Sequence, residues 1–257
     1  MSRLLGKRAL VTAGAQGIGL AISRHLLRAG CDLFVHYRSS SAAALALASE
    51  ATALGRSCGH AGADLTEALE CNRLVAKAVA FLGGLDVLIN NAGSLIARRS
   101  LAEADDEFWA ETMSLNLGTV RRITRAAVPH LAASARAGGG AAIVNLSSLA
   151  GRKGGHTGSL AYATAKGAVL TFTRALSTEL APQGIRVNAV APGLILGTSF
   201  HNTHTTPESA RATVAGIPLG RAGNADDVAR ATVFLAGEYD GFITGATLDI
   251  NGGVYCA

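Results

Sequence analysis

The chain has 257 residues, of which 49% are hydrophobic and 16% charged, a composition that suits one sizeable α/β domain rather than two small ones. Its formal net charge is +5, but the basic residues are scattered and the longest runs are pairs such as Arg121 and Arg122, which argues against a nucleic-acid-binding protein. The four cysteines lack CxxC or metal-ligand spacing, and the sequence contains no signal-peptide pattern and no apolar stretch long enough to cross a bilayer. We therefore expect free thiols, no metal, no membrane contact and a cytoplasmic protein.

Short apolar runs alternate with longer helical patterns along the whole chain. The runs predict strands at 8–12, 32–37, 57–61, 86–90, 141–146, 186–191 and 246–250. Between these runs the sequence predicts helices. One ends near residue 29, one ends near residue 54, and others cover 72–82, about 105–133, the residues after 160 and about 225–236. Strands that are almost continuously apolar are typical of a parallel sheet covered by helices on both faces. We therefore predict a single domain over residues 1–257 with the Rossmann fold, a doubly wound parallel sheet that binds ligands beyond the carboxyl ends of its strands.

A glycine-rich segment, TAGAQGIG at residues 12–19, follows the first predicted strand and opens the first helix. Small residues at this junction let backbone N–H groups and the helix N-terminus approach a pyrophosphate. We expect a nucleotide to bind at this turn, against Gly14, Gln16, Gly17, Ile18 and Gly19. A tight turn without a ligand is the alternative.

Tyr162 and Lys166 lie four residues apart in an Ala-rich helical segment, which makes them close neighbours on one helical face. A free tyrosine has a pKa of about 10 and is a poor base at neutral pH. Because a cation one helical turn away favours the phenolate, we expect Lys166 to bring the pKa of Tyr162 toward the working range. A surface tyrosine–lysine pair is the alternative.

Together these segments resemble the classical short-chain dehydrogenase/reductase family, and the resemblance covers essentially the whole chain. The glycine-rich segment matches the family's T-G-x-x-x-G-x-G except that Ala13 replaces the first glycine. Further matches, in the family's order and spacing, are NNAG at 90–93, LSSLAG at 146–151, Y-x-x-x-K at 162–166, APG at 191–193 and ITGATLDINGG at 243–253. The resemblance implies an oxidoreductase that interconverts a ketone or aldehyde and an alcohol with a nicotinamide cofactor.

The resemblance also implies roles for the residues around the tyrosine. Tyr162 is then the general acid/base, and Lys166 adjusts its pKa and holds the nicotinamide ribose. Ser148 orients the substrate oxygen, because it stands three residues before a glycine as in the family pattern; the adjacent Ser147 is the alternative. Asn116 matches the family's fourth member, which relays protons through water to the lysine, and a purely structural asparagine is the alternative reading of that position.

Several other segments match cofactor-binding positions of the family. By this resemblance Asp64 and Leu65 enclose the adenine. The resemblance also implies cofactor contacts after the fourth and sixth predicted strands, at Asn91, Ala92, Gly93, Pro192, Gly193 and Ile195. The family's threonine, four residues after the glycine of PG, is replaced by Gly197, with Thr198 one residue later.

The end of the second predicted strand, FVHYRSS at 34–40, bears on cofactor choice. An NAD enzyme usually places Asp or Glu here to bind the ribose 2′-hydroxyl, whereas this chain has Tyr37, Arg38 and Ser39. Arg38 can stack on adenine and pair with a 2′-phosphate, which favours NADP(H). Gln16 occupies a position where NADP enzymes of the family often carry Arg or Lys, so NAD(H) stays open.

Two segments, 94–99 and a substrate loop at about 194–216, are expected to shape the substrate pocket. Basic residues in and near them favour an anionic or hydroxyl-rich substrate: Arg98, Arg99, His156 and His201. The spacing of His201 and His204 makes a metal site conceivable, but no cysteine or carboxylate stands nearby, so we assign both to the loop.

The expected substrate is a small carbonyl compound or alcohol. The C-terminal segments look like those of uronate-degradation reductases, which points to a sugar or sugar acid. A 3-oxoacyl-thioester reductase is one alternative, and a non-catalytic dinucleotide-binding sensor is another, although the intact Ser148, Tyr162 and Lys166 argue against the sensor.

Two predicted helices carry apolar residues on more than one face, namely the helix at 105–133 and the helix that holds Tyr162. A helix outside a doubly wound sheet needs only one apolar stripe, so we expect a second buried face on each. The resemblance implies a homotetramer with D₂ symmetry, in which these helices form one contact and the C-terminal strand segment forms another. A monomer whose irregular segments cover these faces is the alternative.

Overall fold

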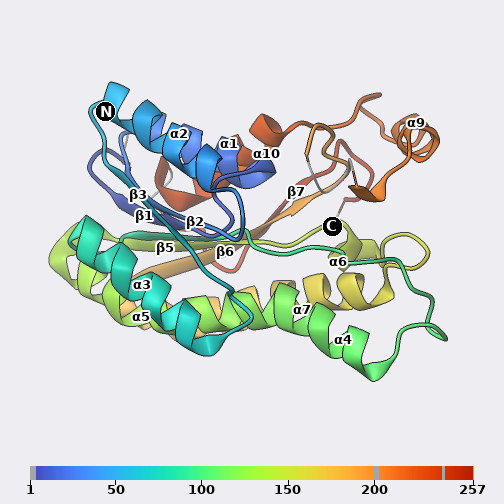
Figure 1. The fold of residues 1–257 in the computed structure, drawn as a ribbon, viewed down its shortest axis with the longest axis horizontal. Helices are drawn as coiled ribbons and strands as arrows, with labels where there is room; N and C mark the ends of the chain where they lie inside the picture. The colour runs from blue at the N-terminus through green and yellow to red at the C-terminus, as the bar shows by residue number, and fades with distance from the viewer. Residues whose placement is uncertain (1–3, 199–202, 239–240, 257) are drawn as a thin grey trace.

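The computed structural model describes residues 4–198, 203–238 and 241–256, and these residues form three layers, with a parallel sheet between two layers of helices (Figure 1). Within them the sheet has the strand order β3-β2-β1-β4-β5-β6-β7, and every pairing is parallel. The strands are β1 (Arg8–Val11), β2 (Asp32–Tyr37), β3 (Cys58–Gly62), β4 (Val87–Asn90), β5 (Ala141–Leu146), β6 (Ile185–Pro192) and β7 (Thr247–Ile250). The predicted doubly wound sheet is therefore confirmed.

Each face of the sheet has its own hydrophobic cluster, because successive strand residues point to opposite faces. In β1, for example, Val11 packs into one cluster and Leu10 into the other. The first cluster is closed by α1 (Gly17–Arg28), α2 (Ser41–Ala53) and α10 (Ala225–Val233), and the second by α3 (Ala68–Leu82), α5 (Thr119–Ser134) and α7 (Leu160–Leu180). Figure 1 shows these two groups of helices above and below the strands.

The chain order reverses between β1 and β4, the two neighbours from which the sheet grows in opposite directions. In a doubly wound sheet this is where the carboxyl ends of the strands open a crevice for a ligand. The glycine-rich segment follows β1 and the segment Asn91–Gly93 follows β4, so the fold brings both to this crevice.

The long helix predicted at about 105–133 contains a π-helical turn in the structure. It consists of α4 (Asp106–Met113), a π-helical turn at Ser114–Gly118 and α5. The prediction of a long helix here is confirmed, because the backbone at Ser114 and at Thr119 stays in the right-handed helical region. The π turn inside the helix, which holds one extra residue, was not predicted. Further short helices, absent from the predicted pattern, are α6 (Ala150–Lys153), a 3₁₀ turn (Ala181–Gln183) and α9 (Pro207–Ala215).

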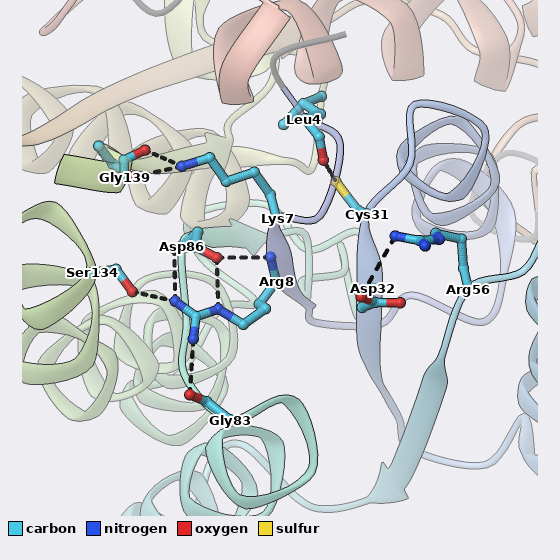
Figure 2. A network of polar contacts seen from close by, with 11 residues as sticks. Leu4, Lys7, Arg8, Cys31, Asp32, Arg56, Gly83, Asp86, Ser134 and Gly139 are labelled. Carbon is cyan, nitrogen blue, oxygen red and sulfur yellow. Dashed lines mark hydrogen bonds and ion pairs between the residues drawn. The ribbon is translucent and has the colours of Figure 1, made fainter. Parts of the chain in front are cut away.

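A polar network ties together the elements at the amino end of the sheet (Figure 2). Arg8 at the start of β1 donates from Nε to Asp86 Oδ2 at 2.8 Å and from Nη2 to Asp86 Oδ1 at 3.0 Å. The same guanidinium reaches Ser134 Oγ at the end of α5 and the Gly83 carbonyl oxygen after α3, both at 2.8 Å. Burial would raise the pKa of Asp86, but its hydrogen bonds with Arg8 outweigh burial and hold that pKa below its usual value.

None of the helices in the described parts of the chain combines the length and apolar character needed to span a membrane.

Candidate active site

A cavity of about 430 Å³ opens at the carboxyl ends of the strands. Its wall runs from the glycine-rich turn after β1, through the segment after β4, to α7 and the segment after β6. Many predicted site residues line it: Gln16, Gly17, Ile18, Asn91, Gly93, Ser148, Tyr162, Lys166, Pro192, Gly193 and Ile195. Residues far apart in sequence are thus brought together at the place that the fold predicts for a ligand.

The glycine-rich turn has the close backbone approach that a phosphate-binding turn requires. A Cβ on Gly19 would stand 2.0 Å from the Ala13 carbonyl oxygen, so no other residue fits there unless the backbone shifts. Gly17 begins α1 with a φ of 50°, in the left-handed region that glycine enters without strain. Gly14 and Gly19 do not line the cavity themselves but allow α1 to begin against β1. The residues present therefore fit a dinucleotide at this turn.

Tyr162, Lys166 and Ser148 meet on one wall of the cavity. The Lys166 ammonium lies 5.8 Å from the centre of the Tyr162 ring and donates to the Leu146 carbonyl oxygen at 2.8 Å. The side chains of Ser148 and Tyr162 are joined by a hydrogen bond. Ser147 turns away, since its hydroxyl donates to the Lys166 carbonyl oxygen at 2.7 Å. The geometry therefore places Ser148, and not Ser147, beside the tyrosine hydroxyl.

The pKa of Tyr162 moves in the direction opposite to the expected one. Burial raises it to about 12, and the hydrogen bond with Ser148 opposes only part of that rise. Burial also lowers the pKa of Lys166 to about 8. The expectation that Lys166 draws the tyrosine pKa downward was wrong for this structure, because the ammonium faces the ring and the Leu146 carbonyl. Tyr162 therefore carries its proton at neutral pH.

Asn116 lies in the π turn between α4 and α5 and is completely buried. Its Oδ1 accepts from the Ser94 backbone N–H at 3.0 Å, and its Nδ2 donates to the Ser94 carbonyl oxygen at 2.8 Å. A Cβ on Gly93 would meet both Asn116 Oδ1, at 2.7 Å, and Lys166 Nζ, at 3.0 Å. The π turn thus sets Asn116 beside the lysine, separated from it by the backbone of the segment after β4.

The predicted adenine-side residues lie outside this cavity, at the carboxyl ends of β2 and β3. Tyr37 is the last residue of β2 and Arg38 and Ser39 follow it, whereas Asp64 and Leu65 follow β3. The Arg38 side chain is 79% exposed and its Nη2 lies 3.8 Å from Asp64 Oδ2. A carboxylate therefore stands beside the guanidinium that the sequence assigns to the cofactor. Ala92 likewise does not line the cavity.

Gly197 occupies the position of the family's threonine after the sixth strand, and the structure places the next residue, Thr198, on the cavity wall. Thr198 is buried and lines the cavity, and its side chain lies 3.6 Å from where a Cβ on Gly17 would stand. Gly197 has a φ of 75°, in the left-handed region that glycine enters without strain. Ala13 also lines the cavity and was not among the predicted site residues.

Of the basic residues expected at the substrate pocket, Arg98 and His156 line the outer part of the cavity, together with Lys153. Arg99 turns away: its guanidinium lies 4.4 Å from the centre of the Phe108 ring and 3.5 Å from Asp105. His201 lies outside the described residues, as does part of the expected substrate loop at 194–216. Within the described parts of the chain, no three histidine, cysteine or acidic side chains gather as a metal site would require.

Comparisons with known proteins agree with this geometry. The model of a family described as Enoyl-(Acyl carrier protein) reductase matches residues 12–255. The 3-oxoacyl-[acyl-carrier-protein] reductase FabG of Staphylococcus aureus is 35% identical over 249 residues, which cover 97% of this chain and 98% of that protein.

Solved structures of oxidoreductases are also similar to this chain. The NADH-dependent reductase A1-R' responsible for alginate metabolism superposes with a TM-score of 0.91 at 36% identity, covering 100% of both chains. A short chain dehydrogenase from Burkholderia cenocepacia in complex with NADP superposes with a TM-score of 0.88 at 32% identity, covering 98% of this chain and 99% of that chain. The chain is therefore an NAD(P)-dependent oxidoreductase and belongs to the short-chain dehydrogenase/reductase family.

Proposed function

We propose that this protein reduces a ketone or aldehyde to an alcohol with NADPH, that NAD(H) is a poorer cofactor, and that residues 1–257 act as one cofactor-binding and catalytic unit. The observation that carries the proposal is the meeting of Ser148, Tyr162 and Lys166 on one wall of a cavity that continues to the glycine-rich turn. Three polar groups able to act on one substrate oxygen, next to a dinucleotide-binding turn, suit hydride transfer coupled to proton transfer.

Tyr162 is the proton donor in this proposal. Its raised pKa keeps the hydroxyl protonated at neutral pH, which suits donation to a carbonyl oxygen during reduction. Ser148, hydrogen-bonded to the tyrosine side chain, orients the same oxygen. Lys166 holds the nicotinamide end of the cofactor. Asn116 holds the backbone segment that lies between its own side chain and Lys166, and supports reprotonation of Tyr162. The bound nicotinamide supplies the hydride.

The cofactor is held by three groups of residues. The turn would hold the pyrophosphate through Gly14, Gln16, Gly17, Ile18 and Gly19. Lys166 and the segments Asn91–Gly93 and Pro192–Ile195 would hold the nicotinamide end. The adenosine end would be held by residues at the ends of β2 and β3, namely Tyr37, Arg38, Ser39, Asp64 and Leu65. The exposed Arg38 and the lack of a carboxylate at the end of β2 support NADP(H).

The proposed substrate is a sugar acid. Arg98, Lys153 and His156 on the outer wall of the cavity complement a carboxylate and hydroxyl groups. The related A1-R' reductase is described as acting in alginate metabolism, which supports the same class. A 3-oxoacyl thioester is the second candidate, favoured by the apolar side chains of Leu149, Ile217 and Val254 on the cavity wall and by the related FabG reductase.

A screen of cofactor oxidation separates these candidates. Purified protein is mixed with NADPH or NADH and with uronate-derived keto acids, neutral sugars or an acetoacetyl thioester. We expect the keto acids to be turned over fastest, and Arg98→Ala to raise KM for them by about tenfold, the scale of one lost charge-assisted contact. Arg99→Ala is the matched control, because Arg99 stacks on Phe108 instead. Turnover of the thioester alone would favour the second candidate.

We also propose that four copies assemble with D₂ symmetry. Half-buried apolar side chains on α4, α5 and α7 support this assembly, and so does the edge position of β7. A cytoplasmic location is consistent with the free state of the cysteines, of which Cys31, Cys58 and Cys71 have pKa values raised by burial.

A further inference from the structure

His36, a buried histidine on β2, contacts the backbone of the glycine-rich turn on the side away from the cavity. The His36 side chain is 4% exposed and does not line the cavity. Its Nδ1 accepts a hydrogen bond from the Ala13 backbone N–H at 3.0 Å, and its Nε2 lies 3.0 Å from the Ala63 carbonyl oxygen. The imidazole therefore connects the turn after β1 to the segment after β3.

These two partners dictate the state of the ring. The Ala13 N–H can only donate and the Ala63 carbonyl can only accept, so the satisfied ring is neutral, with its proton on Nε2. If both ring nitrogens carried protons, the Nδ1–H of His36 would face the N–H of Ala13, and the hydrogen bond between them would be lost.

The residue held by this bond has an unusual backbone conformation. Ala13 has a φ of 48°, one of two non-glycine residues with positive φ in the described parts of the chain, and it stands where the family carries glycine. Alanine enters the left-handed region at a cost that glycine does not have. The Ala13 carbonyl oxygen is also fixed, since it accepts from Asn91 Nδ2 at 3.1 Å. Ala13 is thus held through both its N–H and its C=O.

We propose that His36 is a positioning residue for the cofactor: its neutral ring holds the Ala13 amide and so keeps the glycine-rich turn in the shape that accepts a nicotinamide dinucleotide. His36 acts only through Ala13, which lines the cavity together with Gln16 and Gly17. Because the turn faces the part common to both cofactors, the effect is the same for NADPH and NADH.

The proposal includes a dependence on pH. Burial lowers the pKa of His36, opposed by its hydrogen bond with Ala63 and by the charge of Asp64, the acidic residue just beyond β3, whose carboxylate also faces Arg38. On β3, His60 pairs in register with Val35 and therefore lies on the opposite face of the sheet, beside Tyr37. The first turn of α1 carries no acidic residue. Because the pKa of His36 lies below the usual histidine value of about 6.5, His36 stays neutral at pH 6.5 and above, and acidification through the lowered value protonates it and weakens cofactor binding.

The experiment measures Kd for NADPH and NADH by fluorescence titration of wild type, His36→Asn and His36→Phe, each with and without Ala13→Gly. We expect His36→Phe to raise Kd about tenfold for both cofactors, the scale of one lost hydrogen bond that also leaves a buried N–H unpaired. His36→Asn keeps an acceptor at the position of Nδ1 and stays within about threefold of wild type. In the Ala13→Gly background the His36→Phe penalty shrinks, because glycine adopts the turn without support.

A pH series with NADH provides the second readout, since the 2′-phosphate of NADPH titrates in the same range. We expect Kd of wild type to stay constant above about pH 6.5 and to rise as pH falls further, through the lowered pKa of His36, and Kd of His36→Asn to stay flat. His60→Asn is the matched control and should follow wild type. An unchanged Kd in folded His36→Phe, an equal penalty in both Ala13 backgrounds, or tighter binding by wild type at low pH would overturn the proposal. If His36→Phe fails to fold by circular dichroism, the comparison of wild type with His36→Asn decides.

Discussion

At the scale of single residues, burial dominates the electrostatics of the candidate site. Tyr162 and Lys166 share one helical face, yet their pKa values move apart, to about 12 and about 8. A sequence shows that two such side chains are neighbours, but it does not show which atoms face each other. Here the lysine ammonium faces the ring and a backbone carbonyl, which leaves the hydroxyl to Ser148.

Tyr162→Phe removes the proposed proton donor and keeps the ring. We expect kcat/KM to fall by about 100-fold or more, because general acid catalysis of this kind contributes on that scale. The Kd of the cofactor should be unchanged, since the ring still fills the cavity wall. Steady-state kinetics and fluorescence titration check the two statements, and near-normal turnover would remove Tyr162 from its proposed role.

Arg38 and Asp64 form an opposed pair at the adenosine end, with 3.8 Å between Arg38 Nη2 and Asp64 Oδ2. We expect wild type to have the higher kcat/KM with NADPH, and Arg38→Ala to reduce the ratio of NADPH to NADH by about tenfold as one charge-assisted contact is lost. Asp64→Asn removes the competing carboxylate and should raise that ratio. A wild type that prefers NADH, with a ratio unaffected by Arg38→Ala, contradicts the assignment of NADP(H).

Spacing within the motifs carries the signal for residues that the structure brings together. The intervals within the motifs pointed to Ser148, Tyr162, Lys166 and the segment Asn91–Gly93, and the structure gathers these residues around one cavity. The contact between Ala13 and His36 was not predicted, because it joins the turn after β1 to a residue of β2 that is 23 positions away in the sequence. The sequence does not show which group a histidine in an apolar strand, such as His36, will contact. It does show that Ala13 replaces a glycine of the family motif.

At the scale of elements, strands were easier to predict than helices. A buried parallel strand is a short apolar run with clear ends, and the predicted strands differ from the observed ones by at most one residue at either end. The π turn at Ser114–Gly118 could not be predicted, because its extra residue falls within an unbroken amphipathic pattern. Yet this turn sets the position of Asn116.

The Arg8–Asp86 network gives a prediction for stability, because it joins β1, α3 and α5 at the end of the sheet opposite the cavity (Figure 2). We expect Asp86→Asn to lower the free energy of unfolding by about 2 kcal/mol, between the values for exposed and for fully buried pairs. Glu70→Gln is the matched control: it breaks an exposed pair with Arg73 and should cost less than about 0.5 kcal/mol. Urea unfolding at a fixed protein concentration measures both.

The same pair has a definite pH dependence. The pKa of Asp86 is lowered in the folded protein, so its stabilisation is present above the unfolded-state pKa of 3.8 and is lost as pH falls through the still lower folded value. The difference in stability between wild type and Asp86→Asn should therefore be full at pH 7 and shrink below about pH 4. A difference that grows on acidification would contradict the ion-pair account.

At the scale of the whole molecule, two features of the surface support the proposed assembly. Apolar side chains on the outer helices are only half-buried in the single chain, among them Trp109, Met113, Leu115, Leu117 and Phe172. In addition, β7 is an edge strand, and each of its four residues is half-buried. An edge strand presents unpaired backbone groups unless another element covers it. The two features lie on different parts of the chain, one on the helices and one on the edge of the sheet.

Two separate self-contacts generate a closed assembly of four copies with D₂ symmetry, because each isologous contact supplies one two-fold axis. We therefore expect a mass near four times the 26.0 kDa chain in sedimentation or light scattering at micromolar concentration. Phe172→Glu places a charge on the helical contact alone and should reduce the mass to about twice that of the chain, because a buried unpaired charge is not tolerated there while the β7 contact persists. Wild type at 26.0 kDa would refute assembly. Wild type at twice that mass would leave one contact, and the response to Phe172→Glu would show which of the two it is.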